Sequence, residues 1–201
     1  MSFTAFSRIL TTAALLLLAG ACQAAPAVDA CLACHGVAGQ GSLAGAPRLA
    51  GKNPDYLAHA LSMFRAGTRA SPIMQGIAHG MSDSDMQAFA TYFSQQHPPR
   101  PGGAPTPAPA LVAAGKQLAE NGAGPDLAAC FSCHAAGGKG NGARFPSIAG
   151  ESPAFLVERL HAFQARAKGA PPPPGSMTSV AAKMDETQIQ QAAAYLSQID
   201  P

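Results

Sequence analysis

The sequence has few charges: only 12% of its 201 residues are Asp, Glu, Lys or Arg, and the formal net charge is +2. No basic stripe suggests a nucleic acid as partner, and no acidic tail suggests a solvating role. The composition therefore predicts no nucleic-acid partner and does not choose among other partners.

Long apolar runs are also lacking, because the run at residues 9–20 is shorter than the ~20 residues that a membrane span needs. The run follows Arg8 and precedes small residues, a pattern typical of a secretory signal. We therefore predict that residues 1–24 are a cleaved signal peptide and that the protein is exported to the periplasm. The stretch ending at Cys22 resembles a bacterial lipobox, so lipidation of Cys22, with attachment to a membrane, is the alternative.

Cysteines are scarce, and cleavage would remove Cys22 from the five that the sequence contains. The remaining four form two C-x-x-C pairs, and a histidine directly follows each pair, giving Cys31, Cys34 and His35, then Cys130, Cys133 and His134. No thiol is then left for a structural disulfide.

A C-x-x-C-H motif is the attachment pattern of a c-type haem, with two thioether bonds to the porphyrin and one imidazole on the iron. A structural zinc site or a thiol redox pair is the alternative. Zinc ribbons separate their two pairs by a dozen or two residues, whereas almost a whole domain intervenes here. Export and the immediate histidine point the same way. We therefore predict two covalently bound c-type haems, attached at the four cysteines, with His35 and His134 as iron ligands.

The whole chain is a repeat. An offset of 99 residues (130 − 31) aligns the two motifs and also aligns residues 47–51 with 146–150. After the four prolines at 171–174 the offset becomes 103 (177 − 74). A period this long indicates two tandem domains. We place them at residues 25–97 and 110–201, joined by a proline-rich, semi-rigid linker at 98–109.

Local signals within each half are helical. Asn53-Pro54 and Ser152-Pro153 each place a capping side chain before a proline at the first helical position. Ser82 and Asp185 each open a second helix with a capping box. No alternating strand pattern of useful length is present, so we predict an all-α fold with long loops. A helix at residues 110–120 precedes the second motif, and we expect the first domain to lack most of its counterpart.

Two methionine pairs recur in both halves, Met74 with Met177 and Met81 with Met184. Met81 and Met184 each precede a helix cap, which is the position of a hydrophobic staple. Met74 and Met177 lie in what reads as loop sequence, with no helical face to fill. A methionine is more often a core residue than a ligand, but this comparison predicts Met74 and Met177 as the axial ligands opposite His35 and His134.

Pro47 and Pro146 each follow the histidine of their motif by the same interval. An iron-bound histidine usually donates its other N–H to a carbonyl, which orients the ring. The prolines either supply that carbonyl or simply turn the loop, and the spacing alone favours neither explanation.

With these motifs, the chain resembles a dihaem, two-domain class I cytochrome c of the cytochrome c₄ type. The resemblance covers nearly all of the mature chain. It implies two tandem class I cytochrome c domains, each wrapped around one covalently attached haem with His/Met ligation. It also implies that the prolyl carbonyl accepts from the histidine, which favours the orienting role of Pro47 and Pro146. The short start of the first domain and the insertion at 171–174 depart from the family pattern.

His/Met ligation fills all six iron positions and favours electron transfer over chemistry on a small molecule. We expect a protein that is not an enzyme and that passes single electrons from a quinol-oxidising complex or dehydrogenase to an acceptor such as a terminal oxidase. Its expected partners are therefore redox proteins, including membrane-bound respiratory complexes. The alternatives are a cytochrome subunit of a periplasmic dehydrogenase and a dihaem peroxidase, which needs one haem with an openable position.

Overall fold

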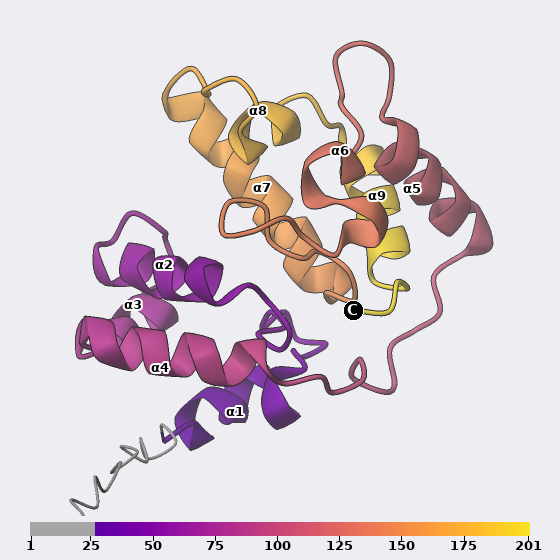
Figure 1. Ribbon diagram of the computed structural model, residues 1–201. Helices are drawn as coiled ribbons and strands as arrows, with labels where there is room; N and C mark the ends of the chain where they lie inside the picture. Colours follow the sequence, from indigo (N-terminus) through magenta and orange to yellow (C-terminus); the bar gives the residue numbers. More distant parts are fainter. Residues whose placement is uncertain (1–26) are drawn as a thin grey trace, which may run out of the picture.

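The computed structural model describes residues 27–201, so the predicted signal peptide and Cys22 lie outside the described part of the chain. This part contains helices and no named strand, with two isolated bridges at Ala123–Leu127 and Asn141–Phe145. The helices form two lobes joined by an extended segment (Figure 1). The all-α prediction is confirmed.

The first lobe packs α2 against α3 and α4. Leu57 of α2 and Ala90 and Phe93 of α4 form its buried core. The helix bounds in this lobe are α1 Asp29–His35, the 3₁₀ turn η1 Val37–Gly39, α2 Pro54–Arg65, α3 Pro72–His79 and α4 Asp83–Ser94.

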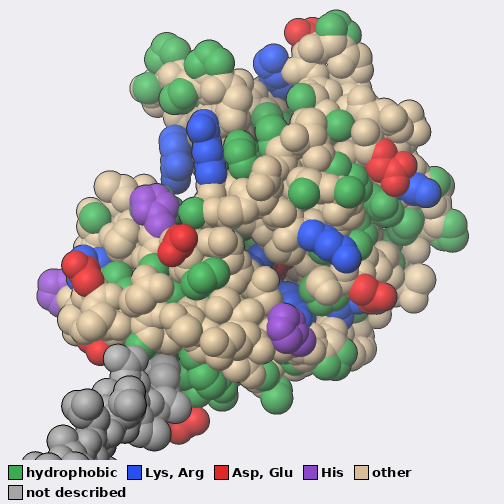
Figure 2. All heavy atoms as spheres, in the orientation of Figure 1, with side chains coloured by type: hydrophobic (Ala, Val, Ile, Leu, Met, Phe, Trp, Pro, Cys, Tyr) green, Lys and Arg blue, Asp and Glu red, His purple; other side chains and the backbone are tan. Residues whose placement is uncertain are grey.

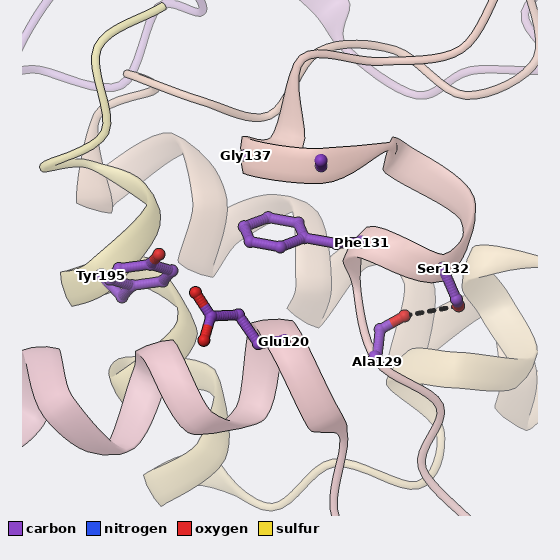
Figure 3. A pocket seen from close by; sticks show the side chains of 7 residues that line it. Glu120, Ala129, Phe131, Ser132, Gly137 and Tyr195 are labelled. Atoms are coloured by element: carbon purple, nitrogen blue, oxygen red, sulfur yellow. Dashed lines mark hydrogen bonds between the residues drawn. The ribbon is translucent and has the colours of Figure 1, made fainter.

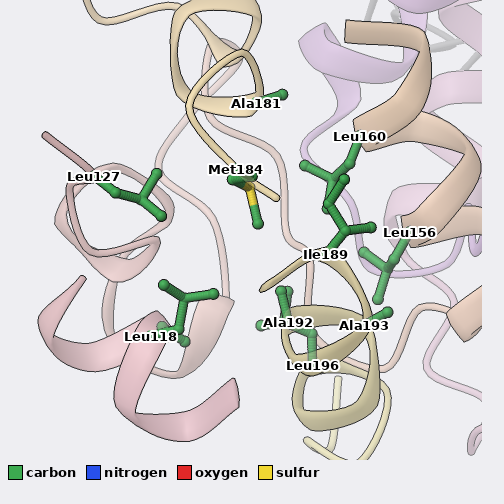
Figure 4. Close-up of a cluster of buried hydrophobic side chains, with 11 residues drawn as sticks. Leu118, Leu127, Leu156, Leu160, Ala181, Met184, Ile189, Ala192, Ala193 and Leu196 are labelled. Atoms are coloured by element: carbon green, nitrogen blue, oxygen red, sulfur yellow. The ribbon is translucent and has the colours of Figure 1, made fainter. Parts of the chain in front are cut away.

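The second lobe is built around α9, which packs against both α5 and α7. Its core gathers aliphatic side chains from several elements, among them Leu118, Leu160, Met184 and Ile189 (Figure 4). The helix bounds here are α5 Pro109–Asn121, α6 Phe131–His134, the 3₁₀ turn η2 Ala136–Gly138, α7 Pro153–Gly169, α8 Met177–Ala181 and α9 Glu186–Leu196.

The predicted caps start the main helices. The Asn53 side chain accepts from the backbone N–H of Tyr56 at 3.1 Å, and the Ser152 hydroxyl accepts from that of Phe155 at 3.2 Å. Ser82 and Asp185 form reciprocal capping boxes at α4 and α9. These contacts satisfy N–H groups that a helix leaves without a partner at its first turn.

The helix-free segment between α4 and α5 spans residues 95–108. The expected linker at 98–109 falls almost wholly inside it, and the exact domain boundaries stay a prediction. Within the described residues, no helix is both long enough and apolar enough to span a membrane.

The contact between α5 and α9 depends on Gly115. A Cβ at this position would collide with the carbonyl oxygen of Gln191 and lie 2.7 Å from the Cβ of Tyr195. We expect Gly115→Ala to force the two helices apart and to lower the free energy of unfolding by about 3 kcal/mol, the upper end of the range for overpacking. Thermal or denaturant unfolding of the haem-loaded protein measures this loss.

Gly76, in α3, provides the matched control, because no atom of the described chain, apart from its two neighbours and the backbone of its own helix, lies within 4 Å of the Cβ it would gain. Gly76→Ala should stabilise the protein by up to about 1 kcal/mol through helix propensity. Equal effects at the two positions would show that close helix packing does not govern Gly115.

Candidate haem-binding sites

Each C-x-x-C-H motif forms one helical turn. Cys31 and Cys34 lie on α1, which ends at His35. In the second lobe Cys130 immediately precedes α6, which carries Cys133 and ends at His134. All four cysteines are free thiols. A single turn therefore presents two sulfurs and one imidazole close together in each lobe, as thioether attachment of a haem requires.

A prolyl carbonyl holds the imidazole in both lobes. The Nδ1 atom of His35 lies 2.8 Å from the carbonyl oxygen of Pro47, and that of His134 lies 2.7 Å from the carbonyl oxygen of Pro146. Nδ1 therefore carries the proton and donates it, and Nε2 is the nitrogen left for an iron. The structure supports the orienting role of the two prolines over that of a simple loop turn.

The loop after each motif has the same unusual backbone. Ala38 and Ala135 have φ angles of 50° and 60°, while glycines occupy the equivalent positions of the other repeat, Gly137 at 66° and Gly36 at 74°. Positive φ costs a residue other than glycine on the order of 1–3 kcal/mol. Both repeats nevertheless keep this conformation, because the loop must return to place the prolyl carbonyl on the histidine.

Both histidines are nearly inaccessible to solvent, with exposed fractions of 7% for His35 and 5% for His134. Burial lowers the pKa of each imidazole, against the opposing effect of the prolyl carbonyl. Two more distant charges act in opposite directions: Glu151 raises the pKa of His35 and Lys52 lowers that of His134. The dominant effect of burial keeps both rings neutral, the form that binds a metal.

The alternatives to haem fit the geometry less well. Burial raises the pKa of the Cys31 and Cys130 thiols, whereas reactive thiols have a lowered pKa. No group of three or more His, Cys, Asp or Glu side chains within residues 27–201 is arranged to hold a metal ion, and a structural zinc site needs four such ligands.

The two predicted methionine ligands do not lie in loops, and this part of the sequence interpretation is wrong. Met74 is the third residue of α3, where the Ser71 hydroxyl accepts from its backbone N–H at 3.4 Å. Met177 is the first residue of α8, which Ser176 caps. A capping serine nucleates a short helix at each position, and Pro72 adds a fixed φ in the first. Their assignment as iron ligands stays a prediction.

The predicted difference between ligand and core methionine is seen in the second lobe, whereas Met74 and Met81 of the first lobe are both half-buried. Met184 is 7% exposed and lies in the same core cluster as Ile189 (Figure 4). Met177 is only partly buried and packs at the edge of that cluster, as Cys130 does. The core therefore accounts for Met184, while Met177, like the haem-attaching Cys130, is only partly buried against that core.

A hollow of about 450 Å³ lies beside the second motif. The ring of Phe131 points into it, with Glu120 and Tyr195 facing the ring and Gly137 above it (Figure 3). Its lining includes neither the cysteines nor His134 nor Met177, so it is not the haem site.

The two lobes meet through a buried ion pair that the sequence analysis missed. Lys52 Nζ lies 2.6 Å from Glu151 Oε1, and the two side chains are 6% and 1% exposed. Glu151 Oε2 also accepts from the backbone N–H of Arg48 at 2.9 Å, and Lys52 Nζ donates to the carbonyl oxygen of Ser147 at 2.6 Å. The available signal was the repeat itself, which places residues 52 and 151 at equivalent positions with opposite charges.

A haem brings two carboxylate groups that need cationic partners, so arginines that form no ion pair within the described chain indicate whether a haem would fit. Arg69 is 7% exposed, stacks on Phe64, and its Nε has no hydrogen-bond partner within residues 27–201. Burial lowers the pKa of Arg159 to about 10, and the charge of Arg69 adds to this effect. Figure 2 shows Lys and Arg side chains next to one another in the notch between the lobes. Haem propionates are carboxylates that would pair with such guanidinium groups, so the residues present fit the cofactor.

Comparison with known proteins gives the same result. The family model for cytochrome c matches residues 23–97 and again 112–200. The thiosulfate dehydrogenase electron acceptor of Thiomonas intermedia (strain K12) is 37% identical over 178 residues, which are 87% of this chain and 80% of that protein.

Two solved structures are similar in fold as well as in sequence. Reduced recombinant cytochrome c₄ from Pseudomonas stutzeri matches with a TM-score of 0.72 and 32% identity, over 86% of this chain and 94% of that chain. The thiosulfate dehydrogenase from Marichromatium purpuratum, in its as-isolated form, matches with a TM-score of 0.75 and 38% identity. The match covers 85% of this chain but only 36% of that longer chain.

The paired motifs, the two matched histidine–carbonyl contacts and these similarities agree on one assignment. The chain belongs to the cytochrome c family and is a dihaem, electron-transferring protein of the cytochrome c₄ type, with two covalently bound c-type haems.

Proposed function

We propose that this chain is the periplasmic electron acceptor of a thiosulfate dehydrogenase and passes the electrons on to a further redox protein. A relative that shares 37% of its residues carries the name thiosulfate dehydrogenase electron acceptor, and a second, from Stutzerimonas stutzeri (strain A1501), carries the same name at 35% identity. Cytochrome c₄ relatives are less similar, at 32%. A dehydrogenase donor therefore has more support than a quinol-oxidising complex.

The observation that best supports electron transfer is that the two sites are equivalent. In each lobe a buried histidine donates from Nδ1 to a prolyl carbonyl, and a methionine follows in the first turn of a short helix. We assign His35 with Met74 and His134 with Met177 as the axial pairs. When bound, each haem supplies an iron that gains and loses one electron.

The residues of the chain prepare that exchange. The cysteines fix the porphyrin covalently, the prolyl carbonyls orient the imidazoles, and the methionine sulfurs would close the sixth position to water and small molecules. Ligands that do not change between oxidation states keep the reorganisation on electron transfer small. A dihaem peroxidase needs one position that opens, and a methionine at the same place in both lobes counts against it.

Location and attachment are part of the same proposal. Thioether haems are expected on an exported chain, and the signal-like sequence at residues 1–24 supports the periplasm. Lipidation of Cys22 would hold the acceptor at the membrane, near its own electron acceptors.

The proposal predicts fast reduction by one specific donor. We expect the oxidised, haem-loaded protein to be reduced by thiosulfate at least about 100-fold faster when a purified thiosulfate dehydrogenase is present, because specific association brings the haems of the two proteins close. Stopped-flow absorbance of the reduced haem band measures the rate.

Two controls complete the experiment. Thiosulfate alone should reduce the protein slowly, and a quinol-oxidising complex with quinol tests the competing donor. Reduction by the quinol complex at a rate that the dehydrogenase does not approach would overturn the proposal and favour the general respiratory carrier.

A further inference from the structure

The buried ion pair between the lobes joins equivalent positions of the repeat. Lys52 follows Gly51 and precedes the cap of α2, while Glu151 follows Gly150 and precedes the cap of α7. The same location thus carries a cation in the first domain and an anion in the second. Each side chain reaches the backbone of the other domain, next to the proline that holds the histidine.

The carboxylate is connected to His35 through a single peptide group. Glu151 Oε2 accepts from the N–H of Arg48 at 2.9 Å, and the carbonyl of that same peptide group is Pro47 C=O, which accepts from His35 Nδ1 at 2.8 Å. Hydrogen bonds in such a chain polarise one another. A negative charge on the N–H side makes the Pro47 oxygen a stronger acceptor and the His35 imidazole a stronger electron donor to iron.

The ammonium group lies beside the equivalent segment of the second domain. Lys52 Nζ donates to the carbonyl of Ser147 at 2.6 Å, and the preceding residue, Pro146, supplies the oxygen that accepts from His134 at 2.7 Å. A positive charge here draws electron density away from the prolyl segment and disfavours a further positive charge on the iron. Its effect is therefore opposite in sign to that of the carboxylate.

We propose that the Lys52–Glu151 pair separates the two haem reduction potentials, lowering that of the first domain and raising that of the second. More electron donation by His35 stabilises the oxidised iron, and a cation near His134 stabilises the reduced iron. Electrons then move by preference from the first domain to the second. The proposal rests on His35 and His134 as ligands and does not depend on the identity of the electron donor.

Arg48 is a further charge that interacts with Glu151. The guanidinium of Arg48 is turned toward the linker, where it donates to the carbonyl oxygens of Pro98 at 2.6 Å and Pro99 at 3.3 Å. It is unchanged in all the variants below and cancels from their comparison. A buried ion pair adds little to stability, because desolvation of both charges offsets their attraction, so stability alone does not explain this pair.

The test is a redox titration of the full, haem-loaded protein, followed by NMR so that each haem is observed separately. Nuclear Overhauser contacts between each haem and side chains of its own lobe assign the signals to the domains. We expect Glu151→Gln to raise the potential of the first haem more than that of the second. Lys52→Met should lower the potential of the second haem more than that of the first.

Exchanging the two charges is the most direct experiment. In the Lys52→Glu, Glu151→Lys double variant the pair is kept and its direction reversed, so the equilibrium constant for electron exchange between the haems should shift about tenfold toward the first domain, which is 59 mV for one electron. Single-charge controls on the exposed surface are Lys168→Met and Asp126→Asn, which make the same changes in net charge and should leave the separation of the potentials unaltered.

The outcomes are distinct. The proposal is supported if the separation of the two potentials shrinks in Glu151→Gln and if the exchange equilibrium shifts toward the first domain in the exchanged pair. Potentials that stay constant, or that shift together as in the surface controls, overturn it. If the exchanged variant does not fold, the unequal shifts in Glu151→Gln and Lys52→Met decide alone. Failure of thiosulfate-dependent reduction would leave these potentials measurable and would count only against the proposed donor.

Discussion

A Cys130→Ala, Cys133→Ala protein is expected to carry a single haem and to have an unfolded second lobe. Without the two thioether bonds the porphyrin is not retained covalently, and a lobe of fewer than about 100 residues often needs a metal or other staple to secure its core. Partly buried side chains such as Phe131, Ile148 and Met177 pack against that core, and they would lose the apolar plate that we expect to cover them.

Intact-protein mass spectrometry measures the loss of one haem, and limited proteolysis with circular dichroism measures the loss of α5 to α9. The reciprocal variant, Cys31→Ala with Cys34→Ala, should lose the other haem and unfold the first lobe. Ser132→Ala changes a residue between the two cysteines of the second motif but leaves both sulfurs, and should retain two haems. A second lobe that resists proteolysis without its haem would contradict the structural role assigned to the cofactor.

Replacement of Met177 by alanine is expected to convert the second site from a closed to an open one. The Met–iron charge-transfer band of that haem should disappear, and its potential should fall by about 0.1 V or more, within the ≈ 0.8 V range that axial ligands span. Cyanide or carbon monoxide should then bind at the vacated position. Optical spectra, redox titration and ligand titration measure the three effects.

Met184→Leu is the matched control. Met184 is buried in the core beside Ile189, so a substitution that conserves volume should cost less than about 1.5 kcal/mol and keep the charge-transfer band. Met74→Ala and Met81→Leu form the corresponding pair in the first lobe. A band that survives Met177→Ala and disappears in Met184→Leu would reverse the assignment of ligand and core residue.

The starts of helices were predictable from the sequence where neighbouring residues determine them. The caps at Asn53, Ser82, Ser152 and Asp185 each satisfy an N–H three residues away, and the four main helices begin where these signals predict. The loop assignment of Met74 and Met177 failed because α3 and α8 have only eight and five residues. An eight-residue helix can still be found from its cap, because Ser71-Pro72 carries the same signal as Asn53-Pro54, but the five residues of α8 are too few for a periodic apolar stripe.

The sequence by itself determined the two haem-attachment turns, the duplication and the helical fold, because each depends on residues that are close in the chain or on a simple offset between two copies. Only the tertiary structure decided which residues meet between the copies. Lys52 and Glu151 form their ion pair across 99 positions of sequence (151 − 52), and Arg69 of the first lobe lies near enough to Arg159 of the second for its charge to lower the pKa of that guanidinium. Such contacts depend on how one lobe docks against the other, and docking is set by the shape and burial of whole surfaces rather than by any local pattern.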